Sequence, residues 1–319
     1  MDIHTFYALV GFMLAAYAVI GNDAVQTLGT FIASNSKSFK WYTLWAAAST
    51  VLAATLVYGW YVNGGDISYG RLAKIPPMQI EWYHALAPAV LVALTRTGIP
   101  VSTTFLVLSV FASTVVLEKM LMKSIVGYGL SAVVAYFLWL VLSRFINEKY
   151  NAVSEKSRPY WRTLQWFSTG FLWFSWLSHD MANIAVYLPR ELPVHLLVGV
   201  IVTLIAWLGV IFYNHGGKIQ EIVLEKTGAR FMRSATIIDL VYACILWYFK
   251  ELNSLPMSTT WVFVGVLTGR EFAIATANRA QYKFGYVFPL VGKDFAKMMV
   301  GLMVSVALVL TVHYLINPQ

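Results

Sequence analysis

Long apolar stretches separated by short polar ones run through the whole chain. Several of these stretches reach the roughly 20 residues that an α-helix needs to cross the hydrocarbon core of a bilayer. They cover residues 3–20, 41–62, 124–145, 193–213 and 294–316. Another apolar stretch begins at 163 and is interrupted at Ser178-His179-Asp180, much as the first one is interrupted at Gly21-Asn22-Asp23. The pattern predicts an all-α membrane protein with broken transmembrane helices.

Two further pairs of apolar segments are too short to cross. Residues 84–97 and 101–114 flank a turn at Gly98-Ile99-Pro100, and each segment has about 14 residues. A second pair, 234–249 and 257–269, flanks Leu255-Pro256. We interpret each pair as a re-entrant helical hairpin, which enters the membrane and returns to the same side.

The two halves of the chain repeat one another. Pro100-Val101-Ser102-Thr103-Thr104 recurs 156 residues later as Pro256-Met257-Ser258-Thr259-Thr260. Gly21-Asn22-Asp23-Ala24-Val25-Gln26 aligns in the same way with Ser178-His179-Asp180-Met181-Ala182-Asn183. Three crossings and a hairpin in each half make an odd number, so the second half is inverted. We predict a first repeat at 1–146, a linker at 147–161 and an inverted second repeat at 162–319.

Composition and charge agree with a membrane protein. The chain is 59% hydrophobic and 12% charged, which is too little polar surface for a soluble protein of this length. The net charge of +8 shows no basic stripe of the kind that binds nucleic acid. The lone Cys244 excludes an intramolecular disulfide.

The basic residues also predict the topology. If both termini lie outside, most Lys and Arg fall on the cytoplasmic side, as the positive-inside rule expects. The outside loops then carry only Arg71, Lys74, Lys119, Lys123 and Arg190. We therefore expect a multi-pass protein of the cell (plasma or inner) membrane with the central linker in the cytoplasm.

The duplicated hydroxyl triplets form a candidate anion site. Proline followed by Ser and Thr is typical of a helix start, where free amides and the positive end of the helix dipole attract anions. Simple N-capping is the alternative interpretation. The candidate substrate-binding residues are Ser102, Thr103, Thr104, Ser258, Thr259 and Thr260.

Two aspartates inside apolar segments form a candidate cation site. An ionised carboxylate there is costly unless it is paired, hydrated or bound to a cation. Asp23 and Asp180 could hold Na⁺ with amide oxygens beside them, and structural hydrogen bonding is the alternative. The candidate cation ligands are Asn22, Asp23, Gln26, Asp180 and Asn183. His179 is either a structural group or a proton-coupling group, and Asp239 is a candidate third carboxylate.

These motifs resemble those of the inorganic phosphate transporter (PiT) family, whose repeats carry G-x-N-D-V-A-N and P-V-S-T-T-H. The resemblance extends over nearly the whole chain. It implies an inverted repeat and symport of phosphate with Na⁺ or H⁺, with the Asn/Asp motifs and the Ser-Thr-Thr tips lining the sites. The sequence departs from the family pattern at Gln26, Phe105, His179 and Trp261. The change of asparagine to His179 weakens the case for sodium.

The sequence thus predicts a cation-coupled phosphate importer that works by alternating access. A sulfate or related oxyanion permease of the same fold is one alternative, and an uncoupled anion channel is another. We predict no enzymatic activity, because Ser102 or Ser258 with His179 would lack a third, orienting group. No cofactor is expected beyond the coupling ion. The partners are the transported oxyanion and the lipid bilayer, and a homodimer is the candidate assembly.

Overall fold

The computed structural model describes residues 2–97, 101–143, 156–216, 220, 232–277 and 284–316. Its regular elements in these ranges are all helical. In the first half they are α1 (Ile3–Val19), η1 (Ile20–Ala24), α2 (Val25–Asn35), α3 (Trp41–Val62), η2 (Trp82–Ala85), α4 (Leu86–Thr97), η3 (Thr104–Leu108) and α5 (Thr114–Ser143). In the second half they are α6 (Arg158–Asp180), α7 (Ala182–Ala185), α8 (Val194–Tyr213), α10 (Met232–Leu252), α11 (Thr259–Ala277), α12 (Phe284–Leu310) and η5 (Thr311–Ile316).

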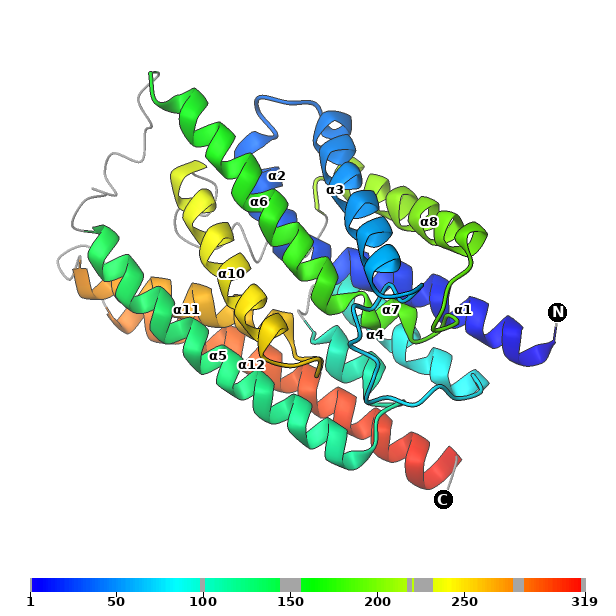
Figure 1. The fold of residues 1–319 in the computed structure, drawn as a ribbon. Coiled ribbons are helices and arrows are strands. Elements are labelled where there is room, and N and C mark those ends of the chain that lie inside the picture. The colour runs from blue at the N-terminus through cyan, green and yellow to red at the C-terminus, as the bar shows by residue number, and fades with distance from the viewer. Residues whose placement is uncertain are drawn as a thin grey trace.

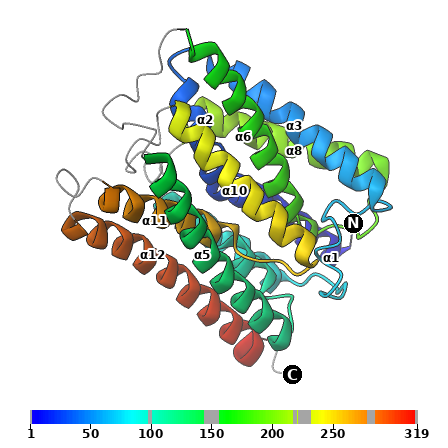
Figure 2. The same cartoon turned by 60° about the vertical axis from the view of Figure 1, so that its left-hand side comes forward.

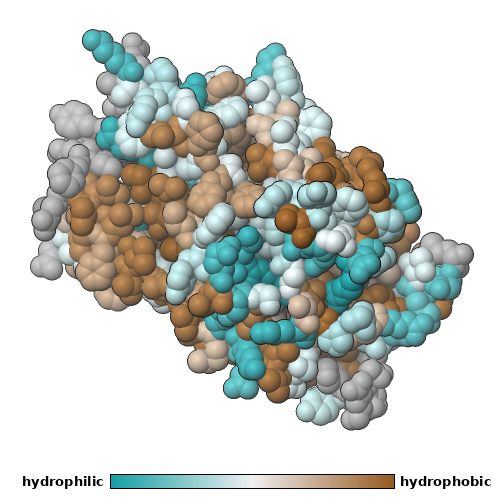
Figure 3. Space-filling view, in the orientation of Figure 1, coloured by the Kyte–Doolittle hydropathy of each residue, from teal (hydrophilic) through white to brown (hydrophobic). Residues whose placement is uncertain are grey.

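Five described helices are long and apolar enough to cross a membrane. They are Ile3–Ala24, Trp41–Val62, Thr114–Leu142, Val194–Tyr213 and Met232–Leu252. Large apolar side chains point outward from several helices, as on α5, where Val126, Val133 and Phe137 are exposed. Figure 3 shows apolar side chains over much of one face, with hydrophilic ones gathered in patches between them. The predicted class, an all-helical membrane protein, is confirmed.

The helices form two groups that meet along α10. α5, α11 and α12 lie together on one side, whereas α3 and α8 pack against each other on the other side (Figures 1 and 2). α10 packs along α6 and also contacts α11 and α2. The N-terminus lies at the right of Figure 1 and the C-terminus at its lower right, whereas α6 begins at the upper left. This arrangement places α1, α6 and the segments before α11 and η3 around a common centre.

α11 approaches α5 unusually closely because two glycines face it. A methyl group at Gly265 would collide with Ser131 and with the carbonyl oxygen of Tyr128. One at Gly269 would collide with the carbonyl of Ala132. Glycines four residues apart lie on one side of a helix and let two backbones come together within a membrane. The spacing therefore fixes α11, and with it the start of that helix, against α5.

The predicted break near Asp23 is wrong in its local detail. The backbone does not unwind at residues 21–23 but widens into the π-helical turn η1, which joins α1 to α2. A π-turn adds one residue to a helical turn and is often found at functional sites. In the second half α6 ends at Asp180, and the four-residue α7 follows after Met181. Both aspartates therefore stand where a helix changes its geometry.

The hairpins also differ from their predicted form. The second arm of the first hairpin contains only the π-helical turn η3 and not a helix over 101–114. In the second pair, α10 has 21 residues and α11 has 19, so these helices are longer than the predicted short arms. α5 and α12 likewise begin about ten residues before the predicted starts. Helical turns with polar or charged residues were missed because hydropathy alone marked the ends.

Some predicted segments lie outside the described residues. These include most of the linker at 147–161, whose last residues belong to α6. They also include much of 214–233, the basic loop predicted between the crossing at 193–213 and the second hairpin. Gly98, Ile99 and Pro100 of the first tip also fall outside.

Candidate functional site

The two Ser-Thr-Thr triplets begin helical turns and are capped by their own serines. The backbone N–H of Phe105 donates to Ser102 Oγ at 3.2 Å. The N–H of Trp261 donates to Ser258 Oγ at the same distance of 3.2 Å. Each serine thus satisfies one of the amides that a helix start leaves free. Capping, the alternative considered for these residues, accounts for both serines and leaves the four threonine hydroxyls for other contacts.

Asp23 receives hydrogen bonds from both tips. Its side chain is buried within η1. Thr103 Oγ1 donates to Oδ2 at 2.6 Å, and Thr260 Oγ1 lies 3.5 Å from Oδ1. The side-chain amides of Asn22 and Gln26 point at Oδ1 from 2.6 and 3.4 Å. Donors to an ionised group make stronger hydrogen bonds than those to a neutral one, so these contacts stabilise the carboxylate.

Asp180 has the matching environment in the second half. Thr259 Oγ1 donates to Oδ2, and Thr104 Oγ1 lies 3.5 Å from Oδ1. Each aspartate therefore contacts the second residue of its own triplet and the third residue of the other triplet. The two third-residue threonines, Thr104 and Thr260, also face backbone oxygens of the opposite tip at 3.2 and 3.3 Å. The two halves make the same contacts in a crossed arrangement.

The amide side chains leave two oxygen atoms without partners. Asn22 Nδ2 donates to Val101 O at 2.7 Å, and Asn183 Nδ2 donates to Thr103 Oγ1 at 3.0 Å. Asn22 Oδ1 and Asn183 Oδ1 are buried and accept no hydrogen bond. A buried carbonyl oxygen without a donor is costly, and few such groups occur in a folded protein. These two oxygens are therefore suited to a hard cation, which binds oxygen ligands.

The side chains of the centre are buried from solvent. The exposed fractions of Ser102, Thr103, Thr104, Ser258, Thr259 and Thr260 are 5% or less. Phe105 and Trp261, which follow the two triplets, meet edge to face with ring centroids 5.5 Å apart. The structure thus brings Asn22, Asp23 and Gln26 together with Asp180, Asn183 and both triplets. In the described residues no group of three His, Cys, Asp or Glu could hold a metal ion.

His179 lies beside this centre and has a contact of its own. Its Nε2 lies 2.7 Å from Leu246 O and 3.5 Å from Arg71 Nη2. A second proton on the ring would place two positive charges side by side in a buried location. The geometry thus favours a neutral imidazole that donates to α10, which was the structural interpretation of this residue. Nδ1 is buried without a partner.

Two basic residues near the second tip were missed by the sequence analysis. Arg71 and Lys123 counted as outside-loop charges, yet both are buried, with exposed fractions of 1% and 8%. Arg71 Nη1 donates to Asn253 O at 2.8 Å. Lys123 Nζ donates to Leu255 O at 2.7 Å and to Phe249 O at 3.1 Å. Burial lowers the pKa of Arg71 to about 10, so it remains protonated at neutral pH.

These two basic side chains bind the C-terminal end of α10 and the segment that leads to the second tip. The carbonyls there carry the negative end of the helix dipole, which attracts positive charge. The sequence carried a signal that Lys123 is buried, because no turn separates it from the apolar crossing that begins at residue 124. The loop that brings Arg71 back to the centre has Tyr69 at φ 56° and Gly70 at φ 72°, a turn that hydropathy cannot reveal.

The chain was compared with known families and structures. No protein-family model matches it, and no curated protein matches it. A solved structure described as "The sodium-dependent phosphate transporter" is similar over 99% of this chain and 100% of that chain, with a TM-score of 0.64 and 15% sequence identity. At this identity the similarity establishes a shared fold.

Proposed function

We propose that the protein is a secondary transporter that imports inorganic phosphate together with a cation, Na⁺ or H⁺, by alternating access. The observation that carries the proposal is the crossed contact of two acidic residues with two hydroxyl-tipped turns in a buried centre. The solved structure that shares the fold is described as a sodium-dependent phosphate transporter, which supports phosphate as the substrate.

Competition for hydroxyl protons explains how anion and cation would be coupled. A threonine hydroxyl has one proton to donate. In the closed centre the hydroxyls of Thr103 and Thr259 donate to Asp23 and Asp180. A cation that neutralises these carboxylates makes them weaker hydrogen-bond acceptors. The threonine hydroxyls can then donate to a tetrahedral oxyanion. Without the cation, the anion would meet two negative carboxylates and no free donors.

Two buried side-chain oxygens support a cation site in this centre. Asn22 and Asn183 each have an unpartnered Oδ1 atom, and their side-chain amides donate to Asp23 and to Thr103, respectively. A Na⁺ ion would bind these oxygens, with Gln26 as a neighbour of the same carboxylate. A proton on either aspartate would neutralise it in the same way.

The proposed topology is an inverted repeat with both termini outside and the linker in the cytoplasm of a cell-membrane protein. The matched contacts of the two halves support two copies of one unit, at 1–146 and 162–319. In Figure 1 the termini lie toward one end of the molecule and the start of α6 toward the other. Such a pair of opposed repeats is a common basis for alternating access.

Uptake into proteoliposomes tests the function. Labelled phosphate and labelled sulfate are each offered with a Na⁺ gradient, with a pH gradient or with neither. We expect phosphate to accumulate above its equilibrium level when one of the cation gradients is present. Accumulation of sulfate instead would identify the alternative substrate, and equilibration without accumulation would identify an uncoupled channel. No movement of either anion would refute the proposal.

A further inference from the structure

Asp239 is a fully buried carboxylate outside the centre described above. It lies on α10, where α2 and α6 pack against that helix. Thr30 Oγ1 of α2 donates to Oδ1 at 2.6 Å, and Thr169 Oγ1 of α6 donates to Oδ2 at 2.5 Å. Three helices thus meet on one acidic side chain, and each carboxylate oxygen receives one neutral hydroxyl.

No cation among the described residues pairs with Asp239. α2 carries no charged residue. The hydrogen bonds of Asp239 go to Thr30 and Thr169, and none goes to a charged or titratable group of α10 or of the helices in contact with it. Those groups are Arg158, Tyr160, Arg162, His179 and Asp180 on α6, Arg233, Tyr242, Cys244, Tyr248, Lys250 and Glu251 on α10, Arg270 and Glu271 on α11, and Glu118, Lys119, Lys123, Tyr128 and Tyr136 on α5. An ionised carboxylate in this setting is costly with two hydroxyls alone.

Polar side chains lie along α2 on both sides of the residue that contacts this carboxylate, toward the centre and toward the end of the helix. Thr27, Thr30 and Ser34 recur on one face of α2. Thr27 Oγ1 donates to the backbone oxygen of Asp23 at 2.6 Å, and Ser34 Oγ donates to Thr30 O at 2.7 Å. Gln165 of α6 donates to Ser34 Oγ and accepts from Asn35 Nδ2. This polar strip runs from Asp23 to the C-terminal end of α2.

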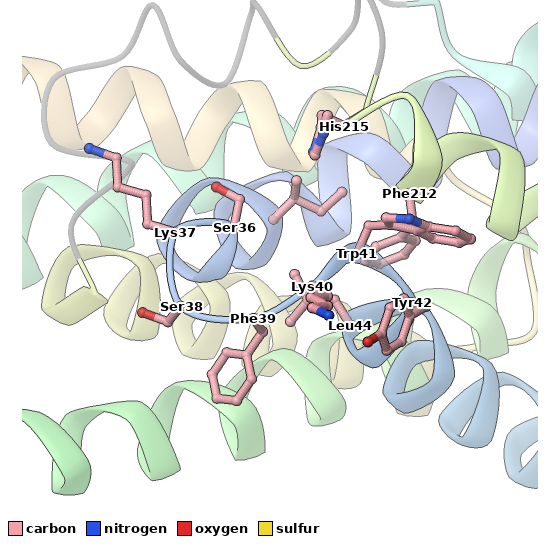
Figure 4. Close-up of a pocket in the computed structure, with 11 residues that line it drawn as sticks. Ser36, Lys37, Ser38, Phe39, Lys40, Trp41, Tyr42, Leu44, Phe212 and His215 are labelled. Carbon is pink, nitrogen blue, oxygen red and sulfur yellow. The ribbon is translucent and has the colours of Figure 1, made fainter.

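The strip ends near an open pocket. The segment after α2 lines a cavity of about 420 Å³ together with residues from the end of α8. Figure 4 shows the hydroxyls of Ser36 and Ser38 and the imidazole of His215 around it, with the ammonium of Lys37 pointing away. Water in such a pocket could exchange protons with the end of the strip.

We infer that Asp239 is a proton-binding site that couples phosphate transport to a pH gradient, separate from the cation site at Asp23 and Asp180. The inference rests on the proposed transport function. A metal cation requires a shell of several oxygen ligands, whereas a proton needs one carboxylate oxygen, and Asp239 has only two side-chain partners. The step forms one O–H bond on Asp239 with a proton from water on one side of the membrane. It breaks that bond by returning the proton to water on the other side.

Replacing Asp239 by asparagine separates coupling from anion movement. Asp239→Asn keeps the size and can still accept from one threonine, but it cannot gain or lose a proton. In proteoliposomes we expect at least a tenfold loss of phosphate accumulation driven by a pH gradient. Exchange of internal for external phosphate at equal pH needs no net proton movement, so it should stay within about threefold of wild type. Glu118→Gln, an exposed acidic residue on α5, serves as the control and should keep both activities.

Each other outcome has a defined meaning. Wild-type accumulation in Asp239→Asn would overturn the inference, and so would loss of exchange in a folded variant. Selective loss of Na⁺-driven uptake would assign the site to sodium and would also overturn it. If wild type itself moves no phosphate, the proposed function fails instead.

If Asp239→Asn does not fold, infrared difference spectra of wild type and Asp239→Glu across about pH 5 to 9 replace the assay. A titrating carboxyl C=O band that shifts in the glutamate variant supports the inference. The absence of such a shift refutes it.

Discussion

The matched contacts of Thr103 and Thr259 make a quantitative prediction about closure of the centre. Valine has nearly the shape of threonine but no hydroxyl, so Thr103→Val and Thr259→Val each remove one donor to a buried carboxylate. A hydrogen bond to a charged group contributes about 1.5–3 kcal/mol. An open arrangement loses less, because water can replace the missing donor. The closed arrangement should therefore be destabilised relative to an open one by about that amount.

This change in free energy corresponds to an open fraction about 10- to 150-fold higher, since each 1.4 kcal/mol is a factor of ten. Labelling of a buried cysteine measures that fraction. Cys244 is the single cysteine, so a Cys244→Ser background with Met257→Cys provides one reporter. Met257 lies at the second tip with an exposed fraction of 1%. Its rate of reaction with a maleimide should rise by the same factor in either valine variant.

The control and the refuting result follow from the same geometry. Thr50→Val removes an exposed hydroxyl of α3 that donates only to its own helix, so it should leave the labelling rate unchanged. A rise below about twofold in both variants would refute the role of the threonine–aspartate contacts in closure. A large rise in only one of the two would contradict the equivalence of the halves.

Three further predictions concern charge and packing. Asp23→Asn and Asp180→Asn should each abolish concentrative phosphate uptake with little loss of folded protein; uptake at the wild-type level would refute the coupling role. Lys123→Met keeps the apolar stem but leaves carbonyls at the end of α10 without a donor, so it should lower the free energy of unfolding by about 2–4 kcal/mol and lower the melting temperature in a thermal melt. Gly269→Ala should lower the melting temperature because the new methyl group meets the α5 backbone, whereas Gly129→Ala faces open space and should not.

Much of the centre could be predicted from sequence because its signals are local. A proline followed by hydroxyl residues starts a helix, and an aspartate within an apolar run demands a partner. Both features occur in the same order in each half of the chain, which indicated that the two triplets and the two aspartates come together in one site. The contact between Phe105 and Trp261 was not predicted, because an aromatic pair across two segments leaves no trace in either segment.

The remaining features depend on contacts between distant segments. Lys123 and Arg71 looked like loop charges because the count considered position along the chain. Their partners, Leu255 and Asn253, lie in the segment that follows α10. The π-helical turn at Asp23 adds one residue to a helix and does not alter hydropathy. Asp239 was noted as a carboxylate, but the hydroxyls that hold it come from two other helices.

The separation of Asp239 from Asp23 determines how strongly a proton and an anion could influence each other. Thr30, which contacts Asp239, lies seven residues after Asp23, about 10 Å along a helix that rises about 1.5 Å per residue. With that rise as the scale of the separation, two unit charges would interact with about 1.7 kcal/mol at an effective dielectric constant of about 20. Removing the charge of Asp239 by protonation would thus favour an added negative charge at the centre more than tenfold. The effect is reciprocal, so a bound anion would favour the proton to the same degree.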